Sequence, residues 1–313
     1  TWDAAGRTMR ARTRCHQVPH MIKNEDHYAL ALHGGAGAIA GRDYARTEEH
    51  LERLATDCQG MLQNSQSALD VVEFAVAELE ASGLYVAGRG SAPNSAGYVE
   101  LDASIMDGRS RGAGAVAALR DFVSPIRVSR AVMEKTQHVM LAGHGAAEFA
   151  RASGFTEVAD AAAYYTLPIG VSREDIGDGR HGTVGAVALD VRGGLAAATS
   201  TGGTFGKLEG RVGDTPLIGP GTWADDDIAI SCTGTGEHII RSGGATLIAF
   251  RYRSGVPLND AIDEMLDEVK RLGGDAGVIA VTRNAEIAMP YNSQGMKRAA
   301  VSTTTPLHVA TFA

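Results

Sequence analysis

A single threonine stands where an apolar strand is expected to begin, and its position suggests a nucleophile. The stretch 181–190 reads HGTVGAVALD, so Thr183 follows a glycine and precedes a run of apolar residues. If the Gly182–Thr183 bond is cleaved, Thr183 gains a free α-amine with a pKa of about 7.7–8.0. That amine would serve as the base for the hydroxyl of the same residue. A plain strand-starting threonine is the alternative for so short a pattern.

Hydroxyl residues and glycines recur at the ends of later apolar segments. The segments are ATSTGG at 198–203, GRVGDTP at 210–216 and SCTGTGE at 231–237. HGGAG at 33–37, GRGS at 88–91 and ELDASIMDG at 100–108 precede them. This ordered set resembles the plant-type L-asparaginase and isoaspartyl peptidase family of N-terminal-nucleophile hydrolases. The resemblance extends from His33 to about Met296, and its specificity lies in the set rather than in any one segment.

The resemblance implies an autoprocessing amidohydrolase with Thr183 as nucleophile. The Thr183 hydroxyl would first attack the Gly182 carbonyl. The mature enzyme would then cleave the side-chain amide of L-asparagine, or the isopeptide bond of β-aspartyl dipeptides, through a β-aspartyl-threonine ester. Thr201 would lie beside the nucleophile. The developing oxyanion needs preorganised donors, and the resemblance assigns these to the Thr233 hydroxyl and the Gly234 backbone N–H.

The resemblance also supplies a clamp for the substrate's α-carbon substituents. A carboxylate is best held by a planar bidentate partner, which suits Arg211. The α-ammonium needs a nearby anion, which suits Asp214, and Gly236 would add a backbone contact to the same ammonium. Without the resemblance, a surface ion pair would be the preferred interpretation of Arg211 and Asp214.

No cofactor is expected for catalysis, but the family carries a structural sodium ion bound by backbone carbonyls. Carried over by position, these carbonyls belong to Leu79, Glu80, Ser82, Tyr85, Ala87 and Arg89.

One residue departs from the family pattern. Val86 stands where relatives have an asparagine close to the active site, and valine offers no hydrogen bond. We therefore expect an effect on catalytic efficiency or substrate preference, not on the fold.

Two other functions stay open at this point. A glycosylasparaginase of the same superfamily is one, although such enzymes tend to have Asp-Thr-Ile-Gly around the nucleophile, where this chain has GTVG at 182–185. An uncleaved, inactive homologue that only binds is the other, and Val86 is its one supporting feature.

Several further patterns are interpreted as structural. The G-x-G-x-x-x-G spacing at 35–41 is one residue too long for a dinucleotide loop. His33 is expected to be structural. Glu100, Asp102 and Asp107 are expected on a strand face or in a turn rather than in acid–base work.

Composition limits the partners. The 313 residues carry a net charge of −8, which argues against nucleic acid or an anionic membrane surface. Three widely spaced cysteines favour a reducing compartment, so we expect a cytoplasmic protein. The resemblance implies a homodimer of cleaved αβ units (α2β2) acting on small-molecule substrates.

The hydrophobic pattern predicts one domain over 27–313, preceded by an arginine-containing extension at 1–26 that is disordered or lies upstream of a natural start at Met21. Self-cleavage would divide the chain into 1–182 and 183–313, and 155–182 would form an exposed linker. Helices are predicted at 47–62, 67–79, 125–135, 145–152 and 258–272. Strands are predicted at 28–32, 98–108, 113–119, 138–141, 183–189, 195–200, 245–251, 277–282 and 286–289. The resemblance implies an α+β fold, a four-layer αββα sandwich of the N-terminal-nucleophile hydrolase type.

Overall fold

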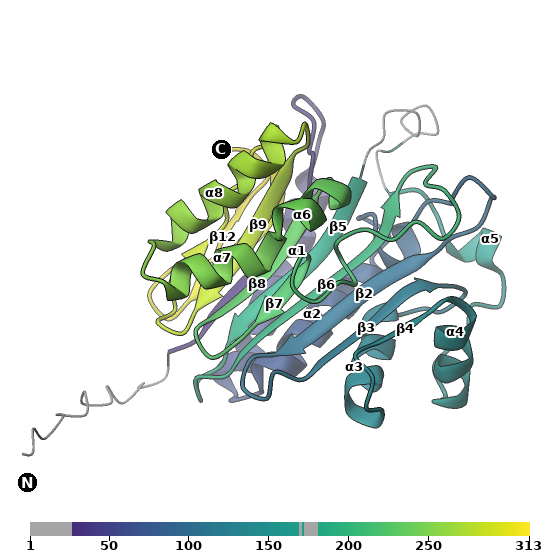
Figure 1. Cartoon of the computed structure of the whole chain (residues 1–313), viewed down its shortest axis with the longest axis horizontal. Helices are drawn as coiled ribbons and strands as arrows, with labels where there is room; N and C mark the ends of the chain where they lie inside the picture. The colour runs from purple at the N-terminus through teal and green to yellow at the C-terminus, as the bar shows by residue number, and fades with distance from the viewer. Residues whose placement is uncertain (1–26, 169–170, 172–180) are drawn as a thin grey trace, which may run out of the picture.

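A computed structural model describes residues 27–168, 171 and 181–313. The predicted extension at 1–26 and most of the polar segment before Thr183 lie outside the described residues. The described part has a mixed α+β fold with two β-sheets (Figure 1). None of its helices combines the length and apolar character needed to span a membrane.

The larger sheet has the strand order β12-β11-β1-β5-β6-β2-β3-β4, and every pairing is antiparallel except that of β3 with β4. Its strands are β1 (Ala29–Ala36), β2 (Leu101–Asp107), β3 (Ala113–Leu119), β4 (Met140–Ala142), β5 (His181–Leu189), β6 (Leu195–Thr204), β11 (Met296–Ser302) and β12 (His308–Ala310). The smaller sheet has the order β10-β9-β8-β7. Its strands are β7 (Thr222–Ala224), β8 (Ile228–Gly234), β9 (Ala276–Thr282) and β10 (Ile287–Ala288).

Helices pack on both sheets. Helices α1 (Ala45–Gln63), α2 (Ala68–Ala81), α3 (Pro125–Lys135) and α4 (Gly143–Ala152) contact the larger sheet. Helices α6 (Gly236–Ser242), α7 (Gly244–Arg253) and α8 (Leu258–Arg271) accompany the smaller sheet (Figure 1). Two short elements, the 3-10 turn η1 (Gly88–Gly90) and α5 (Ala161–Tyr164), lie in the connections.

Alternation along the strands divides the core into separate clusters. On β1, Leu30 and Leu32 belong to the cluster under α1 and α2, whereas Ala29 and Ala31 belong to a second cluster with residues of the smaller sheet. Successive side chains of a strand point to opposite faces, so each central strand is buried on both sides. A third cluster lies between the smaller sheet and its helices. Strands β5 and β6 are buried on both faces.

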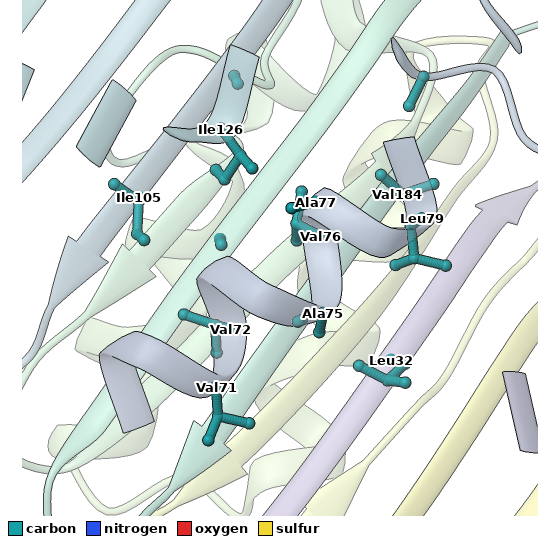
Figure 2. Close-up of a cluster of buried hydrophobic side chains, with 14 of the residues drawn as sticks. Leu32, Val71, Val72, Ala75, Val76, Ala77, Leu79, Ile105, Ile126 and Val184 are labelled. Atoms are coloured by element: carbon teal, nitrogen blue, oxygen red, sulfur yellow. The ribbon is translucent and has the colours of Figure 1, made fainter. Parts of the chain in front are cut away.

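Helix α2 is the central helix of the largest cluster. At its N-terminus, the Ser67 hydroxyl accepts a hydrogen bond of 3.1 Å from the Asp70 N–H and caps the helix. On one face of the helix, Val72, Val76 and Leu79 are fully buried and face the strands (Figure 2). The helix therefore forms the wall behind the strands that carry the nucleophile.

One predicted strand is wrong. Residues 245–251 form helix α7, not a strand. Ala245, Ile248 and Ala249 are its buried residues, at the i, i+3, i+4 spacing of a helix. Gly243 and Gly244 have φ of 84° and 46°, which lets the chain turn sharply into it. A short apolar run does not distinguish a strand from a buried helix.

The predicted exposed linker also needs a correction at its end. Residues 161–164 form the largely exposed α5, but Gly182 is buried and already part of β5, where it pairs with Gly203. Residues 169–170 and 172–180 lie outside the described residues. The bond proposed for cleavage therefore lies inside the structure and not in a surface loop.

Candidate active site

Most of the predicted site residues line one pocket. Its lining residues are Gly182, Thr183, Thr201, Gly203, Thr204, Arg211, Gly213, Asp214, Thr215, Gly234 and Gly236. They come from β5, from β6, from the loop between β6 and β7, and from the junction of β8 with α6. Of the residues predicted for catalysis or substrate binding, Thr233 alone is missing from this lining.

Thr183 occupies an irregular point of its strand. The pairing of β5 with β6 shifts between Gly182 and Val184, and Thr183 is left out of it. The pairing with β1 stops at Gly185 opposite His33. Thr183 is nevertheless buried, with 4% of its surface exposed. The nucleophile candidate is thus enclosed without being held in a strand ladder.

Thr201 is directed at the bond proposed for cleavage. Its hydroxyl donates a 2.5 Å hydrogen bond to the Gly182 carbonyl and accepts one of 2.9 Å from the Gly203 N–H. The Gly203 contact orients the hydroxyl, and the Gly182 contact polarises the carbonyl carbon next to Thr183. Thr201 is therefore well placed to assist attack on Gly182.

Val86 touches the same peptide. Its carbonyl accepts a 3.0 Å hydrogen bond from the Gly202 N–H, which ties its loop to β6. A Cβ added to Gly182 would lie 2.7 Å from both Cβ and Cγ2 of Val86. An apolar side chain therefore lies against the residue before Thr183, at the position where the family pattern has asparagine.

Thr233 and Gly234 lie at the end of β8. Thr233 is fully buried, and its hydroxyl accepts a 3.2 Å hydrogen bond from the Ala36 N–H, which leaves its own hydrogen available to donate. Gly234 has φ of 143°, and a Cβ there would lie 2.3 Å from the Asp275 carbonyl oxygen. Only glycine fits this position, and its backbone lines the pocket.

Arg211 forms a bidentate ion pair with Glu237. Its Nε and Nη2 each donate a 2.7 Å hydrogen bond to one oxygen of the Glu237 carboxylate. Burial works against the charged guanidinium, but the Glu237 bonds raise the pKa of Arg211 overall. A Cβ added to Gly236 would lie 2.9 Å from Asp214 Oδ1 and 3.0 Å from Arg211 Nη2. A positive and a negative group therefore meet at one point of the pocket, as a zwitterionic ligand requires.

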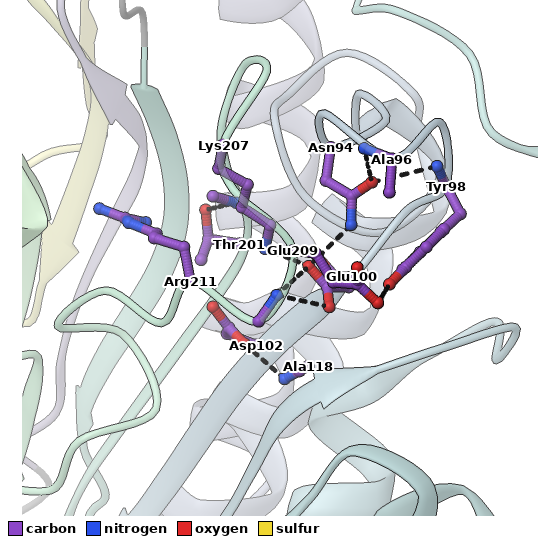
Figure 3. A network of polar contacts seen from close by, with 12 residues as sticks. Asn94, Ala96, Tyr98, Glu100, Asp102, Ala118, Thr201, Lys207, Glu209 and Arg211 are labelled. Atoms are coloured by element: carbon purple, nitrogen blue, oxygen red, sulfur yellow. Dashed lines mark hydrogen bonds and ion pairs between the residues drawn. The ribbon is translucent and has the colours of Figure 1, made fainter.

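Sequence reasoning missed the polar group behind Arg211. The buried Lys207 donates a 3.1 Å hydrogen bond to the Glu100 carbonyl, and the Glu100 carboxylate accepts from the Gly210 N–H at 3.0 Å (Figure 3). Burial lowers the pKa of Lys207. These contacts anchor the residue that precedes Arg211. The sequence signal that could have indicated this group is Lys207, which stands four residues before Arg211 in a polar turn.

The acidic residues of β2 have the structural roles expected of them. Asp102 Oδ1 accepts a 2.8 Å hydrogen bond from the Ala118 N–H of the neighbouring strand, and burial raises the pKa of Asp102. Asp107 accepts hydrogen bonds from Ser110 in the turn that follows β2. Both carboxylates hold backbone in place and neither lines the pocket.

The loop predicted to bind sodium winds tightly between α2 and η1. A Cβ on Gly88 would lie 2.5 Å from the Glu80 carbonyl oxygen, and one on Gly90 would lie 1.9 Å from that of Tyr85. The Arg89 carbonyl accepts a 2.9 Å hydrogen bond from the Thr166 N–H. Within the part of the chain that the structure describes, no group of three or more His, Cys, Asp or Glu side chains is placed to hold a metal.

Comparison with known proteins identifies the family of this chain. The asparaginase family matches residues 26–168 and 161–311. An isoaspartyl peptidase of Salmonella typhimurium is 41% identical over 86% of this chain and 94% of its own length. A human isoaspartyl peptidase/L-asparaginase is 40% identical over 85% of this chain and 90% of its own. A probable isoaspartyl peptidase/L-asparaginase 2 of Arabidopsis thaliana is 38% identical over 87% and 94%. The chain therefore belongs to the asparaginase family that includes the plant-type asparaginases and the isoaspartyl peptidases.

Proposed function

We propose that this chain is an autoprocessing amidohydrolase acting on L-asparagine and on β-aspartyl dipeptides. The observation that carries the proposal is the single pocket in which Thr183 meets Thr201, Arg211 and Asp214. The names of the relatives, isoaspartyl peptidase and isoaspartyl peptidase/L-asparaginase, support both substrate classes.

Maturation begins from the uncleaved chain. The Thr183 hydroxyl attacks the Gly182 carbonyl carbon, whose oxygen already accepts the Thr201 hydrogen bond. Collapse of the intermediate breaks the Gly182–Thr183 amide and moves the acyl group to Thr183 Oγ1, which leaves a free α-amine on Thr183. Water hydrolyses that ester, and the products are 1–182 with a Gly182 carboxylate and 183–313 with an N-terminal threonine.

The freed amine then acts as the base of the mature enzyme. It takes the proton of the Thr183 hydroxyl as Oγ1 attacks the side-chain carbonyl of the substrate. The same proton passes to the leaving group, which departs as ammonia from asparagine or as an amine from a β-aspartyl peptide. Water cleaves the β-aspartyl ester and releases aspartate. The oxyanion of each intermediate is bound by the Thr233 hydroxyl and the Gly234 N–H.

The substrate's α-carbon substituents bind at the opposite-charge pair. Arg211 receives the α-carboxylate, Asp214 receives the α-ammonium, and Gly236 leaves room for both. Because β-aspartyl peptides carry the same two groups, one clamp serves both substrate classes. The leaving group extends away from the clamp.

We extend the proposal to the assembly and its setting. The three core clusters support a four-layer αββα sandwich of the N-terminal-nucleophile hydrolase type, with 27–313 as one domain. The tight turn around Gly88 and Gly90 supports a structural sodium ion on the backbone carbonyls of this loop, outside the reaction itself. Family resemblance supports an α2β2 assembly. The free, buried Cys58 and Cys232 are compatible with the cytoplasm.

The mass of the purified protein after a day at neutral pH tests the nucleophile. We expect fragments 1–182 and 183–313, with Thr183 as the first residue of the second, and a single chain for Thr183→Ala. Release of aspartate from L-asparagine and from a β-aspartyl dipeptide should appear together with the fragments. A wild-type chain that stays intact and inactive would overturn the proposal.

A further inference from the structure

A chain of buried polar groups extends from the nucleophile into the space between the two sheets. It begins at the Thr183 carbonyl oxygen, which lies 3.2 Å from His33 Nδ1, and His33 Nε2 lies 2.9 Å from Ser231 Oγ. Its far end is Ser104 Oγ, which lies 2.6 Å from the carbonyl oxygen of Thr215, the neighbour of Asp214. Three contacts join these ends: Ser231–Thr199 at 2.8 Å, Thr199–Thr222 at 2.5 Å and Thr222–Ser104 at 2.8 Å.

This chain crosses between the two sheets. His33, Thr199 and Ser104 lie on strands of the larger sheet, and Ser231 and Thr222 lie on strands of the smaller one. All five side chains are fully buried beside an otherwise apolar cluster. Burying hydroxyls costs free energy unless their hydrogen bonds are made, and here they are made with one another.

Gly185 makes room for the contact between His33 and Ser231. A Cβ at this position would lie 2.1 Å from Ser231 Oγ and 2.4 Å from His33 Nε2. The glycine two residues after Thr183 therefore allows the chain to reach the nucleophile's own strand.

The contact with Thr183 sets the direction of the hydrogen bonds next to His33. Burial lowers the pKa of His33 to about 3, so its ring carries one N–H at neutral pH. The Thr183 carbonyl only accepts, which assigns that hydrogen to Nδ1 and makes Nε2 the acceptor for the Ser231 hydroxyl. Ser231, Thr199 and Thr222 then each donate toward the nucleophile. Ser104 has one hydroxyl hydrogen, which goes either to Thr222 or to the Thr215 carbonyl. The tautomer of His33 is thus held by the hydroxyls behind it.

Strand pairing holds Thr183 less firmly than its neighbours on β5. It is left out of the pairing of β5 with β6, and the pairing of β5 with β1 ends two residues away. After cleavage Thr183 becomes a chain terminus, and termini fray unless they are tied down. The His33 N–H is the contact on its carbonyl that holds the residue in place.

We propose that His33 is a positioning residue: its Nδ1–H holds the Thr183 carbonyl, and the hydroxyls of Ser231, Thr199 and Thr222 hold the imidazole ring in that tautomer. The proposal rests on the function given above, since it explains how the same nucleophile is held. His33 touches neither the substrate nor the reacting atoms, so its loss should lower kcat and leave KM unchanged.

Two substitutions at His33 separate the two ring nitrogens. The amide of His33→Asn reaches the place of Nδ1 and keeps a donor for Thr183, whereas the amide of His33→Gln reaches toward Ser231 and leaves Thr183. We expect kcat for L-asparagine to fall about 100-fold in His33→Gln, the effect of a misplaced reacting group, and about fivefold in His33→Asn. Both remove the same imidazole, so equal losses of kcat would overturn the proposal.

A second pair of variants decides the matter if the His33 variants do not fold. Ser231→Ala cuts the chain behind His33, and Ser129→Ala removes an equally buried serine that bonds only the Ala103 and Pro125 carbonyls. We expect kcat to fall five- to tenfold at constant KM in Ser231→Ala and to stay within about twofold of wild type in Ser129→Ala. Equal kcat in the two serine variants would contradict the proposal.

The tautomer gives a readout that does not depend on turnover. Nitrogen-15 chemical shifts of His33, assigned by difference with His33→Asn, should show the Nδ1–H form in the wild type and a mixture in Ser231→Ala. An Nε2–H form in the wild type would overturn the positioning role even in an active enzyme. An inactive, uncleaved wild type with the Nδ1–H form would instead remove the proposed function alone.

Discussion

Val86 lies against the Cα of Gly182, in the space that any larger residue at position 182 would need. The two side-chain atoms nearest to a Cβ built on Gly182 are Val86 Cβ and Cγ2, both at 2.7 Å. Real Cβ contacts are not that short, so a side chain at 182 would displace the strand or the loop. The glycine before the nucleophile is therefore required by packing.

Gly182→Ala should slow self-cleavage at least 10-fold, because the new methyl group moves the Gly182 carbonyl away from Thr201 and Thr183. The time course of fragment 183–313 on a denaturing gel measures this. Adding Val86→Gly removes both close atoms and should restore much of the rate, whereas adding Val86→Ala keeps Cβ and should not. Equal rescue by both changes would contradict the packing explanation.

The clamp can be tested by removing groups from the substrate and the enzyme together. 3-Aminopropanamide is asparagine without the α-carboxylate, and succinamic acid is asparagine without the α-ammonium. We expect Arg211→Ala to lose about 100-fold in kcat/KM for asparagine, since the cation proposed to bind the α-carboxylate is removed. The same change should have little effect on 3-aminopropanamide. Asp214→Asn should likewise lower kcat/KM for asparagine and have little effect on succinamic acid. If each variant lowered kcat/KM equally for all three compounds, Arg211 and Asp214 would not bind the carboxylate and the ammonium separately.

Glu237 holds the guanidinium of Arg211 in its orientation, and we expect the charge of this pair to matter for binding. Glu237→Gln keeps one acceptor but loses the parallel charge-assisted bonds of 2.7 Å. KM for asparagine should rise about three- to tenfold with kcat unchanged, because a mobile Arg211 must be ordered when substrate binds. A lower KM would show instead that Glu237 competes with the substrate carboxylate. Initial rates over a range of asparagine concentrations distinguish the two outcomes.

The family resemblance, rather than the residue types alone, selected the residues that line the pocket. Thr183, Thr201, Arg211 and Asp214 all lie in its lining. The long helices also agree with the prediction, because amphipathic spacing is a local signal. In contrast, the strand predicted at 245–251 is helix α7. Its short apolar run is compatible with both structures until its neighbours are known.

The contacts that support the site could not be predicted in the same way. Lys207, Glu237 and His33 act through partners distant in the chain, such as the Glu100 carbonyl, which lies 107 positions from Lys207. His33 was interpreted as structural, and its links to Thr183 and Ser231 depend on the packing of the two sheets. Local sequence patterns do not indicate contacts between residues that are far apart in the chain. The departure at Val86 was recognised, but its contact with Gly182 required the fold.

Glu80 should make the stability of the protein depend on pH. Burial raises the pKa of its carboxyl to about 7, although the Ser124 hydroxyl and the Ile126 N–H donate to it. A raised carboxyl pKa means that the folded chain holds a proton that the unfolded chain releases above about pH 4.5. The stability that protonated Glu80 contributes to the folded chain is therefore fully present below about pH 4.5 and is lost as the pH rises to about 7. Glu80→Gln, which cannot ionise, removes this dependence.

The measurement compares free energies of unfolding in the uncleaved Thr183→Ala background, where one chain unfolds. Between pH 5 and pH 8, the free energy of unfolding of Glu80→Gln should rise relative to that of its Glu80 parent. The expected rise is on the order of 3 kcal/mol, which corresponds to a pKa raised from 4.5 to about 7. Glu78→Gln on the exposed face of the same helix is the control and should track the parent. A constant difference between Glu80→Gln and its parent across this range would mean that Glu80 is ionised in the folded chain.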